Sequence, residues 1–180
     1  MRAAGSAFLL PLLAACAVGN PEFPIAWEPL LPPKSADCRV LQGTYADRGQ
    51  TREGHIARSL TRELFGFREE WGSATRVQLE LPIDDVLAIT VWAGNERLLT
   101  RDLHTVDGEF FCNAGVLVVR DKRWVAEDLL AGHENVRLEL HPADGFVVAR
   151  IREFTFALGF LVVPLVADAT HWYRFQRLSN

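Results

Sequence analysis

The sequence lacks a basic excess and a long apolar run. Its formal net charge is −4, with 19 Lys and Arg against 23 Asp and Glu, which argues against electrostatic binding of nucleic acid. No stretch reaches the roughly 18 uninterrupted apolar residues of a transmembrane helix. Apolar residues make up 49% of the 180 positions, so wholesale disorder is excluded as well. The length is that of one domain with a sizeable core.

The motifs of common enzymes are also missing. The sequence contains no Gly-x-Ser-x-Gly elbow, no glycine-rich phosphate loop and no dinucleotide fingerprint. The five histidines lack the closely spaced pair usual in zinc sites, and we interpret His104 and His141 as exposed strand residues. The pairs Glu69-Glu70 and Asp84-Asp85 are interpreted as solvated loop charges, because adjacent strand residues point to opposite faces. We therefore expect no catalytic residue, no metal, no cofactor and no enzymatic activity.

The N-terminus has the layout of a secretory signal. Arg2 is followed by the apolar run Ala7–Ala15 and then by Cys16, with small residues before the cysteine. Residues 1–15 are therefore expected to be a signal peptide, and the run is too short to span a bilayer as a permanent helix.

The last residues of this leader, Leu13-Ala14-Ala15-Cys16, resemble the lipobox of bacterial lipoproteins. In that family the cysteine becomes the first mature residue and carries diacylglycerol and a further acyl chain such as palmitate. The resemblance implies a lipid anchor at Cys16 and attachment to a membrane, and two or more acyl chains give stable attachment. The residue that follows is Ala17 and not Asp, which implies the outer membrane, with the domain facing the periplasm. The alternative is a plain secretory leader cut near Ala15.

Residues 16–37 contain five of the nine prolines, at positions 21, 24, 29, 32 and 33. This density excludes a regular helix or a central strand. We expect a semi-rigid tether over 16–37. The alternative is an irregular arm, in which Ile25, Trp27 and the leucines Leu30 and Leu31 pack along the domain.

Two further cysteines, Cys38 and Cys112, are expected to form an intramolecular disulfide. An exported domain lies in an oxidising compartment, where two remaining thiols usually pair. A buried reduced pair and intermolecular bridging are the alternatives.

Residues 38–180 show the two-residue alternation and the turn dipeptides of antiparallel β-structure. Turns are predicted at Gly94-Asn95, Asp107-Gly108, Asp121-Lys122 and over 142–145. A helix is predicted over Gly54–Phe67, where Ile56, Leu60 and Leu64 recur every four positions. The predicted fold is mainly β, a single antiparallel β-barrel or β-sandwich of about eight or nine strands with one short helix. The predicted strands are Arg39–Ala46, Arg76–Leu81, Val86–Ala93, Arg97–Val106, Glu109–Asn113, Val116–Arg120, Val136–His141, Phe146–Phe156 and His171–Leu178.

Within the first of these strands, Leu41-Gln42-Gly43-Thr44-Tyr45 resembles the first strand of lipocalin-type barrels. The resemblance implies that Arg174, on the last strand, lies against Tyr45. The chain departs from lipocalins in having Tyr where they have Trp, and in having no long helix after the last strand. The whole layout also resembles small bacterial lipoproteins that have no assigned activity.

The segment Phe154–Ala167 carries no charge in 14 residues. We expect a buried strand pair here, or a strand and a core-covering loop. The alternative is the wall of an apolar cavity or a surface patch that contacts lipid or a partner. The candidate ligand-binding residues are aromatic and could line the same interior: Trp92, Phe110, Phe111, Phe160 and Trp172.

The sequence therefore favours a non-enzymatic, membrane-anchored lipoprotein that binds an apolar small ligand, a lipid or another envelope protein. The alternative is a structural or assembly accessory protein of the bacterial envelope. A closed internal cavity would favour ligand binding, whereas a filled core with an exposed apolar patch would favour a partner.

Overall fold

The computed structural model describes residues 16–19, 22–27, 30, 37–127, 130–159 and 163–179. In this part of the chain the fold is mainly β, with twelve strands and one α-helix, which confirms the predicted class. The predicted signal peptide, 1–15, lies outside the described residues. None of the described helices is long and apolar enough to cross a membrane. The elements are β1 (Cys16–Gly19), η1 (Ile25–Trp27), η2 (Cys38–Leu41), β2 (Gly43–Ala46), β3 (Arg48–Gln50), β4 (Ile56–Ser59), α1 (Leu60–Phe65), η3 (Glu69–Trp71), β5 (Arg76–Ile83), β6 (Val86–Ala93), β7 (Glu96–His104), β8 (Phe110–Asn113), β9 (Val116–Glu127), β10 (Leu130–Ala143), β11 (Phe146–Gly159) and β12 (Val163–Leu178).

Nine strands follow one another in a single hydrogen-bonded path, β7-β6-β5-β2-β12-β11-β10-β9-β8, and neighbours along it are antiparallel. Strand β1 lies parallel to β12, and β3 joins β4 to β12. Among the described residues no register pairs the end strands β7 and β8. The sheet is therefore open and not a closed barrel.

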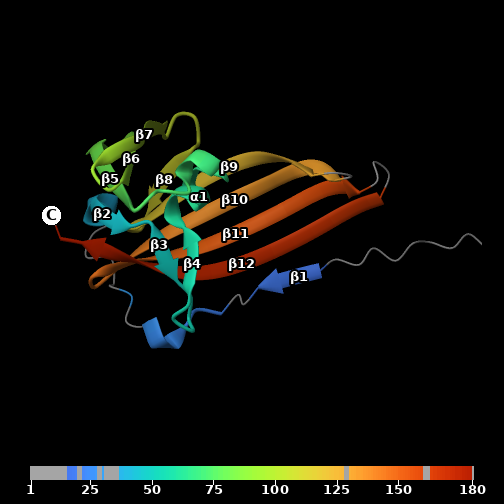
Figure 1. Cartoon of the computed structure of the whole chain (residues 1–180), viewed down its shortest axis with the longest axis horizontal. Helices are drawn as coiled ribbons and strands as arrows, with labels where there is room; N and C mark the ends of the chain where they lie inside the picture. Colours follow the sequence, from blue (N-terminus) through green and yellow to red (C-terminus); the bar gives the residue numbers. More distant parts are fainter. Residues whose placement is uncertain are drawn as a thin grey trace, which may run out of the picture.

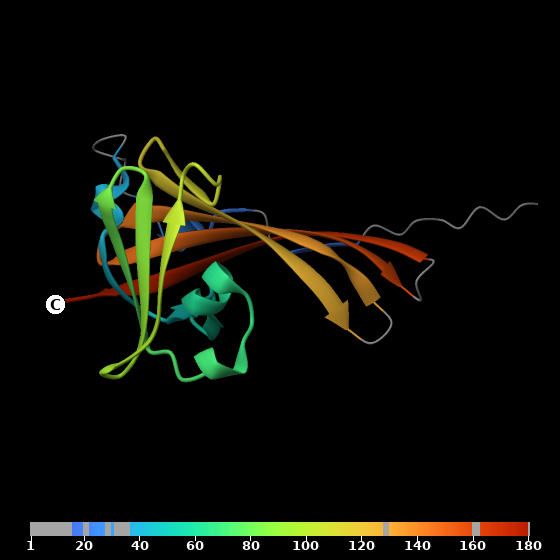
Figure 2. The same cartoon turned by 90° about the horizontal axis from the view of Figure 1, so that it is seen from above.

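The sheet folds over on itself, so that β5–β7 cross one face of β9–β12 as a second layer (Figure 2). Strand β12 connects the two layers, because it pairs with β11 along its length and with β2 only at Arg177 and Leu178. We call the face of β9–β12 that packs on the second layer the inner face, and the opposite one the outer face. The core between the layers includes Tyr45, Val77, Leu79, Leu87, Ile89, Leu103, Phe110, Leu117, Leu138, Leu140, Ile151 and Phe175.

Strands β9–β12 continue well beyond the second layer as a long, four-stranded extension (Figures 1 and 2). The predicted turn at Asp121-Lys122 is wrong, because β9 runs through it, with Asp121 paired to Val136 and Lys122 to Asn135. An Asp-Lys dipeptide supplies no glycine for a tight turn, and the partners on β10 complete the ladder.

The helix is shorter than predicted, because it begins at Leu60 and not at Gly54. The carboxylate of Asp47, which is fully buried, accepts hydrogen bonds from the hydroxyls of Ser59 and Thr61 at 2.9 and 2.6 Å, and from the Thr61 backbone N–H at 2.9 Å. These hydrogen bonds to Asp47 fix Ser59 as the N-cap of α1. Residues 56–59 pair with β3 as a strand. Leu60 and Leu64 are buried, as their four-residue spacing predicts.

The first predicted strand, Arg39–Ala46, is a strand only from Gly43, because Cys38–Leu41 forms the 3₁₀ helix η2. The buried Tyr45 donates its hydroxyl to the Leu41 carbonyl at 2.8 Å. Arg177, and not Arg174, lies over the Tyr45 ring, 5.9 Å from its centroid. The role that the lipocalin resemblance implied for Arg174 is therefore wrong.

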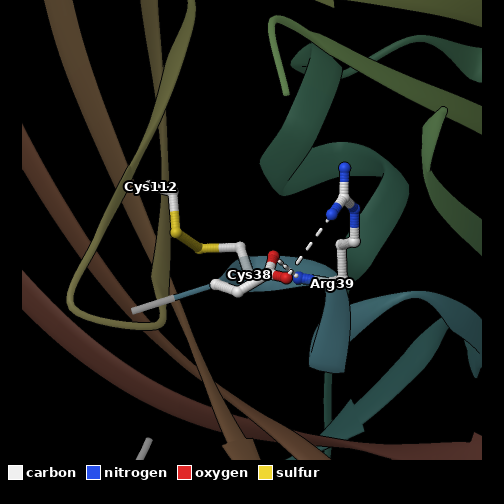
Figure 3. Close-up of a disulfide and its surroundings, with 4 residues drawn as sticks. Cys38, Arg39 and Cys112 are labelled. Carbon is white, nitrogen blue, oxygen red and sulfur yellow. Dashed lines mark hydrogen bonds and ion pairs between the residues drawn. A yellow bond between two sulfur atoms is a disulfide. The ribbon is translucent and has the colours of Figure 1, made fainter. Parts of the chain in front are cut away.

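The disulfide between Cys38 and Cys112 is confirmed, with the two Cα atoms 5.9 Å apart. The bond joins Cys38 of η2 to Cys112 of β8 (Figure 3). Because β8 is the last strand of the path, the disulfide fixes the start of the domain to the far end of the sheet. Next to it, the backbone N–H of Arg39 donates to the Asp37 carboxylate at 2.8 Å.

Candidate functional site

The aromatic residues predicted to share a ligand wall lie in different surroundings. Phe110 belongs to the core, where it is fully buried. Trp92 is half-buried on β6, with the guanidinium of Arg76 5.1 Å from its ring centroid. Trp172 is half-buried on the outer face of β12, and Phe160 lies outside the described residues. The structure therefore does not bring Trp92, Phe110 and Trp172 together around one interior.

A hollow of about 580 Å³ lies where β2, β5 and the end of β12 meet. Its lining is rich in polar side chains, among them Gln42, Gln78, Glu80 and Arg177. This hollow does not have the apolar lining expected of a lipid cavity.

Residues 154–159 and 163–167 of the apolar segment form the ends of β11 and β12, and the large side chains whose burial is described there are exposed. Phe156 is 47% exposed and Leu165 is 45% exposed, and Phe154, Leu158 and Val166 are comparably open. The expectation of a buried strand pair is wrong at these residues, because the second layer does not reach them (Figure 2). The surface-patch alternative describes them.

The strand register gathers these side chains on the outer face. Phe156 pairs with Val166 on β12 and with His133 on β10, and His133 pairs in turn with Trp124 on β9. Directly paired residues point to the same side of a sheet, so these four form one row. Trp124 is 63% exposed and packs edge-on against His133, with ring centroids 4.7 Å apart. We call the exposed apolar residues of this region the distal face: Trp124, Phe154, Phe156, Leu158 and Val166.

A row of three arginines borders the distal face. Arg120, Arg137 and Arg152 pair across β9, β10 and β11, two rows away from Trp124. Like charges placed opposite one another on a sheet destabilise it. Arg137 forms an ion pair with Glu139 at 2.8 Å, whereas Arg120 and Arg152 are exposed. We call these three residues the arginine row, and its concentration of positive charge suits an anionic partner.

The N-terminal segment lies along the domain where it is described. Strand β1 pairs with β12, with Cys16 opposite Ala167, beside Val166 of the distal face (Figure 1). Farther along, Phe23 contacts the ring of Trp172 at a centroid distance of 5.1 Å, and Trp27 is buried. Of the packing residues that the irregular-arm interpretation names, Trp27 is buried as expected, whereas Ile25 is 77% exposed and that part of the interpretation is wrong. Leu31 lies outside the described residues.

A polar cluster that the sequence analysis missed lies between α1 and the inner face. Arg58 on β4 forms ion pairs with Glu63 of α1, at 3.6 Å, and with Glu153 of β11. His171 on β12 lies 3.7 Å from the Glu153 carboxylate. These contacts tie β4 and α1 to the extended strands. The residues come from three separate segments of the chain, the β4–α1 segment, β11 and β12, so no local pattern in the sequence indicates the cluster.

Burial dominates the electrostatics of this cluster. It raises the pKa of Glu63 from 4.5 to about 7, although Arg58 acts in the opposite direction. Burial, and then the nearby Arg58, lowers the pKa of His171. A carboxyl that is half-protonated near neutral pH can donate or accept a proton. That the chain is not an enzyme therefore stays a prediction.

The acid pairs singled out from the sequence lie at exposed turns. Glu69 and Glu70 are exposed in η3, and Asp84 forms an ion pair with Arg39 at 2.7 Å. Asp85 accepts a hydrogen bond from the Thr105 hydroxyl. Within the described ranges no group of three or more His, Cys, Asp or Glu residues is arranged to hold a metal ion.

The two strand histidines lie on different layers. His104 is half-buried at the end of β7, and its backbone N–H donates to the Glu109 carboxylate. His141 is half-buried on β10, with its ring centroid 6.0 Å from that of Trp172, and burial lowers its pKa.

Comparisons of the chain with protein-family models, with curated proteins and with solved structures found no match.

Proposed function

We propose that this chain is a lipid-anchored lipoprotein of the bacterial envelope that faces the periplasm from the outer membrane and binds through its distal face. Cys16 carries the anchor, and the role is binding and not catalysis. The lipobox-like leader supports the anchor, and the distal face of the described structure supports the binding role.

The observation that carries the binding role is the exposure of the distal face. Five large apolar side chains stand on one side of strands that extend beyond the core. Contiguous apolar patches of this kind usually mark interaction sites, because leaving them in water is costly.

The packing of the core supports a surface role over an enclosed ligand. Tyr45, Phe110 and Phe175 fill the space between the layers, and each is about 1% exposed or less. In ligand-carrying barrels the sheet encloses a cavity. If the layers of this protein enclosed one, these three residues would line it. Binding at the outside of the extension is compatible with this filled interior.

Mass spectrometry of the protein purified from the membranes of its own host tests both parts of the proposal. We expect a mature chain that begins at Cys16 and carries the mass of a diacylglycerol and one further acyl chain. The Cys16→Ala variant should lack this mass. An unmodified cysteine in the wild-type protein would overturn the anchor.

The same preparation, sprayed under native conditions, addresses the mode of binding. We expect a domain that carries only its Cys16 lipids, because the core is filled. A stoichiometric small molecule that is released on denaturation would instead show an enclosed ligand and would contradict binding at the distal face.

A further inference from the structure

We propose that the distal face is occupied by the lipid bilayer itself. In this arrangement the ends of β11 and β12 and the start of β1 immerse in the membrane interface, while the arginine row contacts anionic headgroups. The inference rests on the proposed function for the anchor at Cys16, and it deepens that function by naming what the binding surface binds.

The outer face changes from charged to apolar in four successive rows. The first row holds Arg120, Arg137 and Arg152, and the second holds Lys122 and Phe154. The third is the row of Trp124 and Phe156, and the fourth consists of Ala126, Ala131, Leu158 and Pro164. Rows are about 6.7 Å apart, so the gradient covers about 20 Å. The same order is found at a membrane–water interface: cations come first, then aromatic side chains, and then small and aliphatic residues.

The register of β1 places the anchor at the right level of this gradient. Cys16 lies opposite Ala167, between the second and third rows. The chain then runs toward Gly19, away from the apolar end of the strands. The fourth row lies about 10 Å beyond Cys16, which matches the depth that interfacial helices reach. The arginine row lies about 10 Å on the other side, at the level of headgroup phosphates.

Exposure on both faces of the extension favours a bilayer over a protein partner. Leu165 is 45% exposed, and the alternation along β12 places it on the inner face, opposite Val166. A second copy or an envelope protein seated on the outer face would leave Leu165 in water, whereas immersion of the strand ends covers both sides.

Charge is divided between the two faces of the extension. In the four rows from the arginine row outward, the outer face carries four cationic side chains, those of Arg120, Lys122, Arg137 and Arg152, and the carboxylate of Asp168. In the adjoining row toward the body of the protein, Glu139 forms ion pairs with Arg137 and Arg150. The cationic excess of the four rows stands out in a chain whose net charge is −4. Basic clusters beside an apolar segment bind anionic lipid, at about a fivefold gain in affinity for each charge near the surface.

A fluorescent probe on the distal face tests the proposal in the lipidated protein. Phe156→Cys supplies the labelling site, because Cys16 carries lipid and the other two cysteines form the disulfide. Ile83→Cys is the matched control, since Ile83 is apolar, 58% exposed and lies at the end of β5 in the second layer. Both proteins are reconstituted into vesicles of phosphatidylethanolamine and phosphatidylglycerol that contain lipids with a nitroxide on the acyl chain. We expect strong quenching at position 156 and little at position 83.

A second measurement removes the anchor. The mature chain with Cys16→Ser should float with anionic vesicles and bind neutral phosphatidylcholine vesicles more weakly. Phe156→Glu should weaken binding about tenfold, since it replaces a half-exposed aromatic ring by a charge, whereas Ile83→Glu should leave it unchanged. The double variant with Arg120→Gln and Arg152→Gln loses two positive charges. It should therefore lose most of the preference for anionic lipid.

The outcomes separate this inference from the proposed function. A protein that carries lipid at Cys16 but leaves position 156 unquenched overturns the inference alone. Absence of lipid at Cys16, read from the mass of the same sample, overturns the proposed function. A probe at position 156 that becomes shielded without vesicles, in a concentration-dependent way, assigns the face to a second copy. A photo-crosslink from position 156 to one envelope protein in cells assigns it to that protein.

Discussion

Replacing Glu63 by glutamine tests the polar cluster that holds α1 against the inner face. The Glu63 side chain is 1% exposed, and burial raises its pKa from 4.5 to about 7. In the unfolded chain the carboxyl regains its ordinary value. Ionisation is therefore easier in the unfolded chain, and deprotonation of Glu63 destabilises the fold as the pH increases.

The magnitude follows from the two pKa values. The stability associated with the protonated carboxyl is fully present below about pH 4.5 and is lost as the pH rises through about 7. A pKa difference of about 2.5 corresponds to about 3 kcal/mol in the free energy of unfolding. Between about pH 5 and pH 8 the wild type should lose about 2.5 kcal/mol that Glu63→Gln keeps.

Urea unfolding at several pH values between about 5 and 8 measures this difference directly. The charged neighbours of Glu63, which are Arg58, Arg62, Arg123 and Glu153, remain in both proteins, so the comparison changes only the carboxyl of Glu63. Glu70→Gln is the control, because Glu70 is exposed beside Arg68 and its replacement should leave the pH profile unchanged. Parallel profiles for the wild type and Glu63→Gln would refute the argument from burial.

Three further substitutions test the packing. Cys38→Ser with Cys112→Ser opens a loop of about 75 residues and should lower the free energy of unfolding by about 4 kcal/mol in urea titrations, and a loss under about 1 kcal/mol would contradict the loop-entropy argument. Asp47→Ala removes the acceptor of three buried donors and should lower the free energy of unfolding by about 2 to 4 kcal/mol. Asp47→Asn should lower it by less. Gly49→Ala would place a methyl group 2.6 Å from the Phe175 ring, so thermal unfolding should show destabilisation that Phe175→Leu partly relieves; additive effects would exclude the clash.

Local patterns were sufficient for much of the second layer. The alternation of Val77, Leu79 and Leu81 correctly predicts the buried side of β5. Gly94-Asn95 correctly predicts the turn between β6 and β7, and Gly94 adopts the positive φ that favours glycine there. In both cases the residues that decide the structure are adjacent in sequence.

Long-range partners decide the features that the sequence analysis missed. The start of α1 depends on the carboxylate of Asp47, which is 12 residues before Ser59. The arginine row takes one residue from each of three strands and becomes visible only when their register is known.

Composition correctly identifies Phe154–Ala167 as unusual but does not say how far a second layer reaches. The exposure of Phe156 depends on the lengths of β5–β7 relative to those of β11 and β12. An apolar strand pair is therefore ambiguous in sequence between core and surface until the opposing layer is placed.

The parallel pairing of β1 with β12 has a mechanical consequence. A pull on Cys16 away from the domain acts along the axis of β1, because the strand starts at the distal end and runs back toward the body of the protein. Such a force loads the four paired residues of β1 together, in shear, and the hydrogen bonds must break nearly at once. A pull on Gly19 perpendicular to the sheet would instead open the same pairs one after another. Strand β1 therefore resists separation from β12 most strongly when the pull acts at its N-terminal end.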